Sequence, residues 1–170
     1  SESELRLLNE QLRENAQLFQ TTLASISQGI VLVDAAGRVR TFNARVCELL
    51  DLPKSLLDAH PLLTEVMRYQ RERGDFGPEG QWVGEEARSN VMDTSGLPTK
   101  THPTRYLRAT RVGQTLEVRT QQLPSGGLVR TFTDVSDYVK VQADRQRLNE
   151  LLAATQTIAR VGGWERDHVQ

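Results

Sequence analysis

Residues 28–43 read QGIVLVDAAGRVRTFN, and this stretch decides the fold class of the chain. Its first run, Gly29 to Val33, is aliphatic and rich in β-branched residues, which favours a strand. The segment Ala35-Ala36-Gly37 then offers a turn, and Arg38 to Phe42 alternates polar with apolar residues as a half-buried strand does. The stretch therefore predicts a β-hairpin.

Two helices are expected after the hairpin. Asn43 is a good N-cap for a helix over residues 44–50. Pro61 suits the first turn of a second helix over residues 62–73, which Gly74 ends. Strands and helices in this order predict an α+β fold.

The rest of the middle region returns to extended structure. Residues 82–92 are expected to hold one more short helix. Residues 104–111, 115–123 and 128–133 are three extended runs separated by glycine-containing turns, which predicts an antiparallel meander. With the hairpin, the meander gives a five-stranded antiparallel sheet with short helices on one face.

Long helices are predicted at both ends, because neither Glu4–Ile26 nor Tyr138–Arg160 contains glycine or proline. The first helix carries an apolar stripe at heptad-like spacing, which favours a coiled coil and a homodimer. The alternative is that this helix packs on its own domain. The residues expected at the dimer interface are Leu5, Leu8, Leu12 and Phe19.

Composition excludes several classes of protein. The 21 Lys and Arg residues balance 22 Asp and Glu residues, so we expect no nucleic-acid partner. The single cysteine, Cys47, can form no internal disulfide, which fits a reducing, cytoplasmic setting. The apolar runs are far shorter than the roughly 20 residues that a membrane span needs, so we expect no membrane contact in this part of the chain.

Five short motifs together resemble those of a PAS sensor domain. They are Asp34 and Gly37 in the hairpin, Asn43 after it, Gly74-Asp75-Phe76-Gly77, and Asp134-Val135-Ser136 within the closing stretch GGLVRTFTDVSDY. The resemblance implies a PAS fold between long flanking helices. The boundaries expected from it are 1–27 for an N-terminal signalling helix, 28–136 for the PAS domain, 137–160 for a connector helix and 161–170 for the opening strand of a following, truncated PAS-like module.

The same resemblance implies a function in signal transduction. We expect a sensory and dimerisation module of a bacterial protein, most simply a sensor histidine kinase, whose output domain belongs to the same parent chain. A diguanylate cyclase or phosphodiesterase is the alternative output, and a ligand-free structural spacer is the alternative role. Asp134 and Ser136 are expected to couple the domain to its exit helix, and no catalytic motif is apparent in this fragment.

The resemblance also bears on cofactors. Haem-binding members take the iron on a histidine of the helix that corresponds to residues 62–73, which contains none, although His60 lies just before it. Blue-light members use a cysteine in an NCRFLQ-like helix, whereas this chain has NARVCELL with Cys47 out of place. We therefore expect no haem, flavin or metal, a colourless protein, and at most a small acidic metabolite as ligand.

The sharpest expectation concerns Arg130. On the strand before it, Leu116, Val118 and Thr120 alternate with polar residues and should face the interior. Leu128, Arg130 and Phe132 resemble the family's pocket-facing positions, and a buried guanidinium calls for an anion. The opposite register, with Arg130 in solvent or paired with a protein carboxylate, remains open. The residues expected around an acidic ligand are Arg130, Thr120, Phe132, Tyr69, Met67 and Arg108.

Overall fold

The structure is a computed structural model that describes the backbone of residues 1–25, 27–99 and 101–169, and the side chains of residues 1–18, 27–99 and 101–156. By its internal contacts the chain divides into two units, Ser1–Asp134 and Val135–Gln170. The sheet and the short helices all belong to the first unit, so that unit contains the candidate site.

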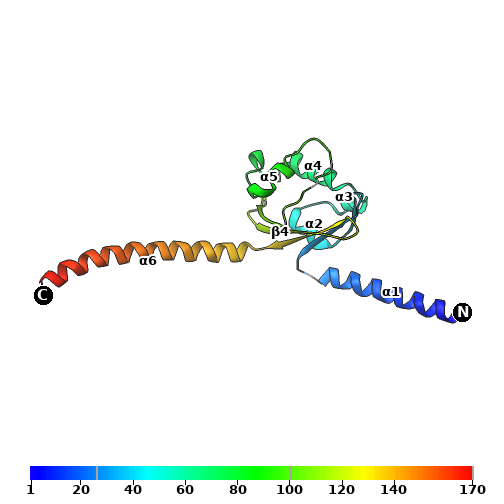
Figure 1. Cartoon of the computed structure of the whole chain (residues 1–170), viewed down its shortest axis with the longest axis horizontal. Helices are drawn as coiled ribbons and strands as arrows, with labels where there is room; N and C mark the ends of the chain where they lie inside the picture. The colour runs from blue at the N-terminus through cyan, green and yellow to red at the C-terminus, as the bar shows by residue number, and fades with distance from the viewer. Residues whose placement is uncertain (26, 100, 170) are drawn as a thin grey trace. The chain divides into compact units, whose positions relative to one another are not determined.

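Five antiparallel strands form one sheet in the order β2-β1-β5-β4-β3 (Figure 1). They are β1 (Gly29–Val33), β2 (Val39–Phe42), β3 (Arg105–Ala109), β4 (Thr115–Gln122) and β5 (Leu128–Asp134). The last strand joins the two predicted parts of the sheet, because β5 pairs with β1 on one side and with β4 on the other. The predicted hairpin, meander and α+β fold class are confirmed.

Four short α-helices lie on one side of this sheet (Figure 1). They are α2 (Ala44–Leu50), α3 (Lys54–Asp58), α4 (Leu63–Arg73) and α5 (Glu85–Val91), with a 3-10 turn, η1 (Pro78–Gly80), between the last two. Three of the helices fall where the sequence predicts them. Helix α3 was not predicted, since a five-residue helix is too short to show a periodic apolar face.

Asn43 caps helix α2, as predicted, and also binds the backbone at the start of β1. Its Oδ1 accepts hydrogen bonds from the backbone amides of Val46 (3.2 Å) and Ile30 (3.0 Å), and its Nδ2 donates to the carbonyl of Gln28 (2.7 Å). The start of α2 is thereby tied to β1. Gly29 allows this close approach, because a Cβ there would lie 2.9 Å from the Cα of Val46.

The core lies between the inner face of the sheet and these helices and is largely aliphatic. As predicted, Leu116, Val118 and Thr120 of β4 are buried. Two arginines, Arg108 of β3 and Arg130 of β5, are buried on the same face. The fully buried side chains of largest volume are Phe76, Leu57, Leu116, Gln70, Val39, Val46, Val83, Val91 and Val118.

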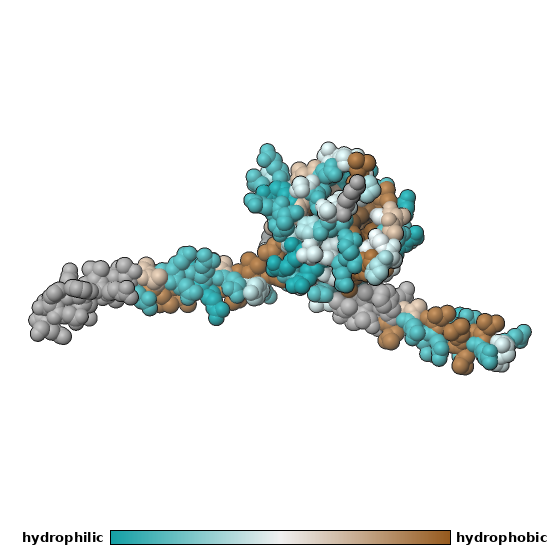
Figure 2. All heavy atoms as spheres, in the orientation of Figure 1, coloured by the Kyte–Doolittle hydropathy of each residue, from teal (hydrophilic) through white to brown (hydrophobic). Residues whose placement is uncertain are grey.

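The N-terminal helix α1 spans Glu2–Ser25. Leu5, Leu8 and Leu12 are 61%, 52% and 59% exposed, and Figure 2 shows hydrophobic residues along this helix. The side chain of Phe19, the fourth expected interface residue, lies outside the described residues. Among the described helices, none is both long enough and apolar enough to cross a membrane.

The C-terminal helix α6 spans Ser136–Val169, which is longer than the predicted connector. Residues 161–169 are therefore helical, and the expected strand at this place was wrong. A helix satisfies its backbone hydrogen bonds within itself, whereas a strand needs a neighbouring strand to do so. That a further module begins here stays a prediction.

Candidate ligand-binding cleft

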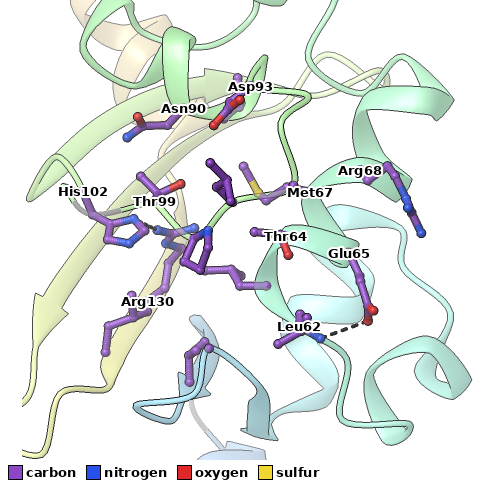
Figure 3. Close-up of a pocket in the computed structure, with 18 of the residues that line it drawn as sticks. Leu62, Thr64, Glu65, Met67, Arg68, Asn90, Asp93, Thr99, His102 and Arg130 are labelled. Carbon is purple, nitrogen blue, oxygen red and sulfur yellow. Dashed lines mark hydrogen bonds between the residues drawn. The ribbon is translucent and has the colours of Figure 1, made fainter.

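A cleft of about 810 Å³ opens between α4, α5, the segment that follows α5, and the inner face of the sheet (Figure 3). This volume falls within the range that pockets for small molecules occupy. The cleft is apolar along Leu63, Met67 and Leu128, with Arg130 in its wall. The region between α4 and the meander is thus open and not filled by side chains.

Arg130 faces this cleft from β5. Its residue is 6% exposed, and in the strand register it stands opposite Val31 of β1 and Thr120 of β4. Its Nε donates to the Thr120 hydroxyl at 3.0 Å, and its Nη2 lies 3.0 Å from Nδ1 of His102. Of the two registers that the sequence left open, the inward one is observed.

The partners of Arg130 are neutral. Within the described part of the chain, no carboxylate forms an ion pair with this guanidinium. A buried cation is costly unless an anion or several hydrogen bonds compensate it. Thr120 and His102 supply two hydrogen bonds but no negative charge.

His102 lines the cleft beside Arg130, and the sequence did not indicate this position. Figure 3 shows its ring beside the end of the Arg130 side chain, next to Thr99. Because Nδ1 accepts from a guanidinium, the ring is neutral and its proton lies on Nε2. Burial, and then the charge of Arg130, lower the pKa of His102, against a weaker opposing effect of the Thr99 backbone. Its sequence context, Thr101 and Pro103, indicates only a loop.

Met67 and Thr120, two of the other expected ligand residues, differ in their relation to the cleft. Met67 lines it from α4, on the same helical face as Leu63 and Thr64. Thr120 does not line the cleft, but it anchors the Nε of Arg130. It therefore positions the guanidinium and is placed to act on a ligand only through Arg130.

The remaining three expected residues do not line the cleft. Tyr69 lies two positions from Met67, on another side of α4, with the Arg73 guanidinium carbon 5.0 Å from its ring centroid. Phe132 lies two residues after Arg130 on β5 and packs in the core. Arg108 is 4% exposed, and its guanidinium carbon lies 4.9 Å from the centroid of the Phe76 ring.

The two residues expected to couple the domain to its exit helix lie at the end of β5 and at the start of α6. Asp134 is the last residue of β5, aligned with Leu116 of β4, and Ser136 is the first residue of α6. The strand thus ends two residues before the exit helix begins. Their role in transmitting a signal stays a prediction.

His60 and Cys47 are the residues on which the expectations about haem and flavin depend. His60 Nδ1 donates a hydrogen bond to the Val39 carbonyl at 2.9 Å. Cys47 is half-buried against the core, where burial raises the pKa of its thiol. No cluster of three or more His, Cys, Asp or Glu that could hold a metal occurs among the described residues. Whether the protein carries haem or flavin stays a matter for experiment.

A family model described as "PAS fold" matches residues 23–143. The chain belongs to the PAS family. The match includes the whole sheet, all four short helices and every residue of the cleft named above. The PAS domain therefore provides the frame in which Arg130 and His102 are held.

One solved structure similar to this chain is a domain of a sensory box sensor histidine kinase/response regulator from Geobacter sulfurreducens. The sequence identity is 21% and the TM-score is 0.43, and the match covers 72% of this chain and 96% of that chain. Another is the PAS domain of an HTR-like protein from Haloarcula marismortui, with 16% identity, 76% and 98% coverage, and a TM-score of 0.41. The search of curated proteins found no match.

Proposed function

We propose that this PAS domain is a sensory module that binds a small acidic molecule in the cleft through Arg130. The observation that carries the proposal is a guanidinium that is 6% exposed, forms part of the wall of an open cleft of about 810 Å³, and forms no ion pair within the described part of the chain. A carboxylate or phosphate entering the cleft supplies the missing negative charge.

The chemistry of the wall defines the class of ligand. Charge-assisted hydrogen bonds from arginine to an oxyanion are about twice as strong as neutral ones. The apolar side chains of Leu63, Met67 and Leu128 suit a carbon skeleton, while Thr64 and Asn90 offer further polar contacts. The ligand that fits is an organic acid with a partly apolar body.

The flanking helices provide the route for a signal. Leu5, Leu8 and Leu12 on α1, and Tyr138, Val141 and Leu148 on α6, are large apolar residues that are at least half exposed in the single chain. Pairing these helices in a parallel homodimer covers them, and a ligand bound in the cleft then biases one of two helix arrangements.

The output domain in this proposal is a histidine kinase in the same parent chain, with a diguanylate cyclase or phosphodiesterase as the alternative. The ligand-free spacer is the less favoured role, since it gives no account of a buried arginine in the wall of an open cleft. The signalling role places no catalytic step within this domain.

Mass spectrometry of small molecules released from the purified protein tests the ligand. Wild-type protein is expected to release an acid that Arg130→Met protein lacks. Arg119→Met is the matched control, because it removes a guanidinium from the opposite face of the same sheet. If all three proteins release the same molecules, or none releases any, Arg130 does not retain an acid from the cell.

Sedimentation tests the dimer separately. Leu8→Asp places a charge in the proposed interface, and Leu7→Asp places the same charge on a leucine of another helical face that is also more than half exposed. We expect a dimer for the wild type and for Leu7→Asp, and a monomer for Leu8→Asp. A monomeric wild type at high micromolar concentration contradicts the proposed assembly.

A further inference from the structure

The C-terminal helix α6 carries an apolar stripe that is interrupted by one charged residue. The stripe follows alternate steps of three and four residues, so its members occupy the a and d positions of a heptad, which face the partner helix in a coiled coil. Four of its members are large apolar residues that are about half exposed or more in the single chain, and Figure 2 shows hydrophobic residues at the surface of this helix. The members are Tyr138, Val141, Arg145, Leu148, Leu152 and Thr155.

Thr155 suits this stripe in spite of its hydroxyl group. Its Oγ1 donates to the Leu151 carbonyl of the preceding turn at 2.8 Å, so the hydroxyl is satisfied within the helix and the methyl group can pack against a partner. Other polar side chains of α6 bond to each other away from the a and d positions, Asp144 with Arg147 and Gln146 with Glu150. The polar groups of this helix are thus arranged around the stripe and not across it.

Arg145 occupies an a position in the middle of the stripe. Its side chain is exposed in the single chain and forms no ion pair with the residues that the structure describes. In a parallel coiled coil the same a residue of two copies meets in one layer, so two guanidinium groups come together there. Their mutual repulsion costs stability unless a carboxylate lies beside each of them.

Asp144 is placed to supply these carboxylates. It occupies the g position just before Arg145, and in a parallel, in-register pair the g residue of one helix borders the a residue of the other. Its ion pair with Arg147 is 3.3 Å long, between side chains that are 58% and 77% exposed, and a pair so exposed contributes little. In an antiparallel pair, Arg145 would instead face a d residue, all of which in this stripe are uncharged.

From these observations we propose that α6 pairs with α6 of a second copy of this chain as a parallel, in-register coiled coil, in which Asp144 of each copy neutralises Arg145 of the other. The proposal rests on the homodimer of the proposed function and specifies how its exit helices meet. The complementary charges make a second copy the occupant of the stripe. They also select the register, because a shift by one heptad places Arg145 opposite Tyr138 or Leu152 and away from Asp144.

Cysteine cross-linking of the full chain tests the parallel register. In a Cys47→Ala background, Val141→Cys and Leu152→Cys each place one thiol in the stripe, at a d and an a position. We expect both variants to form interchain disulfides under mild oxidation, because each thiol meets its own copy. Glu150→Cys, at an exposed f position, is the control and should stay reduced. In an antiparallel pair at most one position can meet its own copy, so a disulfide in only one of the two variants, or in neither, overturns the proposal.

Sedimentation equilibrium tests the two charges. Arg145→Leu should strengthen association of the full chain about tenfold or more, since an apolar layer replaces two facing guanidiniums. Asp144→Asn should weaken association about threefold in the wild-type background and leave it unchanged in the Arg145→Leu background, as expected for a pair that acts together. Arg147→Gln is the matched control, because it removes the partner of Asp144 within the helix without touching the stripe.

The outcomes separate this proposal from the proposed function. A dimeric wild type whose association is weakened or unchanged by Arg145→Leu overturns the pairing proposed for α6 and leaves the homodimer and the acid-binding cleft in place. Tighter association of Asp144→Leu than of Arg145→Leu also overturns it, because it assigns the interface to the neighbouring stripe of Val141, Asp144, Leu148 and Leu151. A monomeric wild type overturns the homodimer together with this proposal.

Discussion

The two faces of the sheet differ in how their arginines are paired. On the outer face, Arg105 and Arg119 share the carboxylate of Glu117, with Arg105 Nε 2.9 Å from its Oε2. On the inner face, Arg108 and Arg130 are buried and form no ion pair within the described part of the chain. The same residue type thus occurs neutralised outside and unneutralised inside.

This difference separates a structural role from a binding role. The outer arginine side chains are more than half exposed, and an ion pair at such an exposed position contributes little to stability. The hydrogen bond from Arg119 holds the pKa of Glu117 below its usual value, against the effect of burial. Inside, a buried guanidinium without a counter-charge costs free energy of folding, and binding of a small acid is our account of why the fold keeps Arg130.

The largest difference in stability is expected between removing the charge of a buried carboxylate, Asp75, and removing that of Glu117 on the outer face of the sheet. Asp75→Asn removes the buried partner of Arg73 and Arg111 and should lower the free energy of unfolding by about 3 kcal/mol, as breaking a buried ion pair does. Glu117→Gln, on the outer face, should lower it by less than about 1 kcal/mol. Urea denaturation measures both, and equal losses break the comparison.

A smaller effect of opposite sign is expected for Arg108. Arg108→Met should raise the free energy of unfolding by about 1 kcal/mol, because a buried charge without an ion pair is replaced by an apolar chain of similar length. Arg105→Met should change it by no more than about 0.5 kcal/mol. A marked loss of stability in Arg108→Met shows instead that its stacking on Phe76 outweighs its burial.

The smallest effect concerns pH. Folding lowers the pKa of His102 below its ordinary value of about 6.5, so the unfolded chain takes up a proton more readily than the folded one. The free energy of unfolding should therefore fall as pH drops from about 6.5 toward the lowered pKa. His102→Gln should flatten this slope. An identical slope in wild type and variant assigns the pH dependence to other groups.

Much of the fold could be predicted because its signals are local. The strand Gly29–Val33 and the helix Ala44–Leu50 were predicted with their observed bounds, the strand from its run of β-branched and aliphatic residues and the helix from its N-cap Asn43. The strand expected in residues 161–170 was wrong over the described residues 161–169, which are helical, because strand formation depends on a neighbouring strand that local sequence does not reveal. Local sequence patterns therefore predict helices and strands better than they predict which strands pair.

The site could be predicted only in part. Arg130 alternates with Thr131 along β5, and the sequence could not tell which of the two faces the core. Pairing of β5 with both β1 and β4 decides this, because it aligns Arg130 with Val31 and Thr120. His102 could not be found from sequence, since it reaches Arg130 from an irregular segment 28 positions earlier.

The central claim, that the inner face holds a guanidinium for an acid, is tested most directly by calorimetric titration with a panel of small carboxylic acids, each paired with its amide. We expect at least one acid to bind the wild type and Arg119→Met at least about tenfold more tightly than its amide, since a hydrogen bond to a charged group contributes about 1.5 to 3 kcal/mol. Arg130→Met should bind that acid and its amide equally weakly. Acid binding that survives in Arg130→Met, or a panel in which no acid is preferred over its amide, contradicts the account.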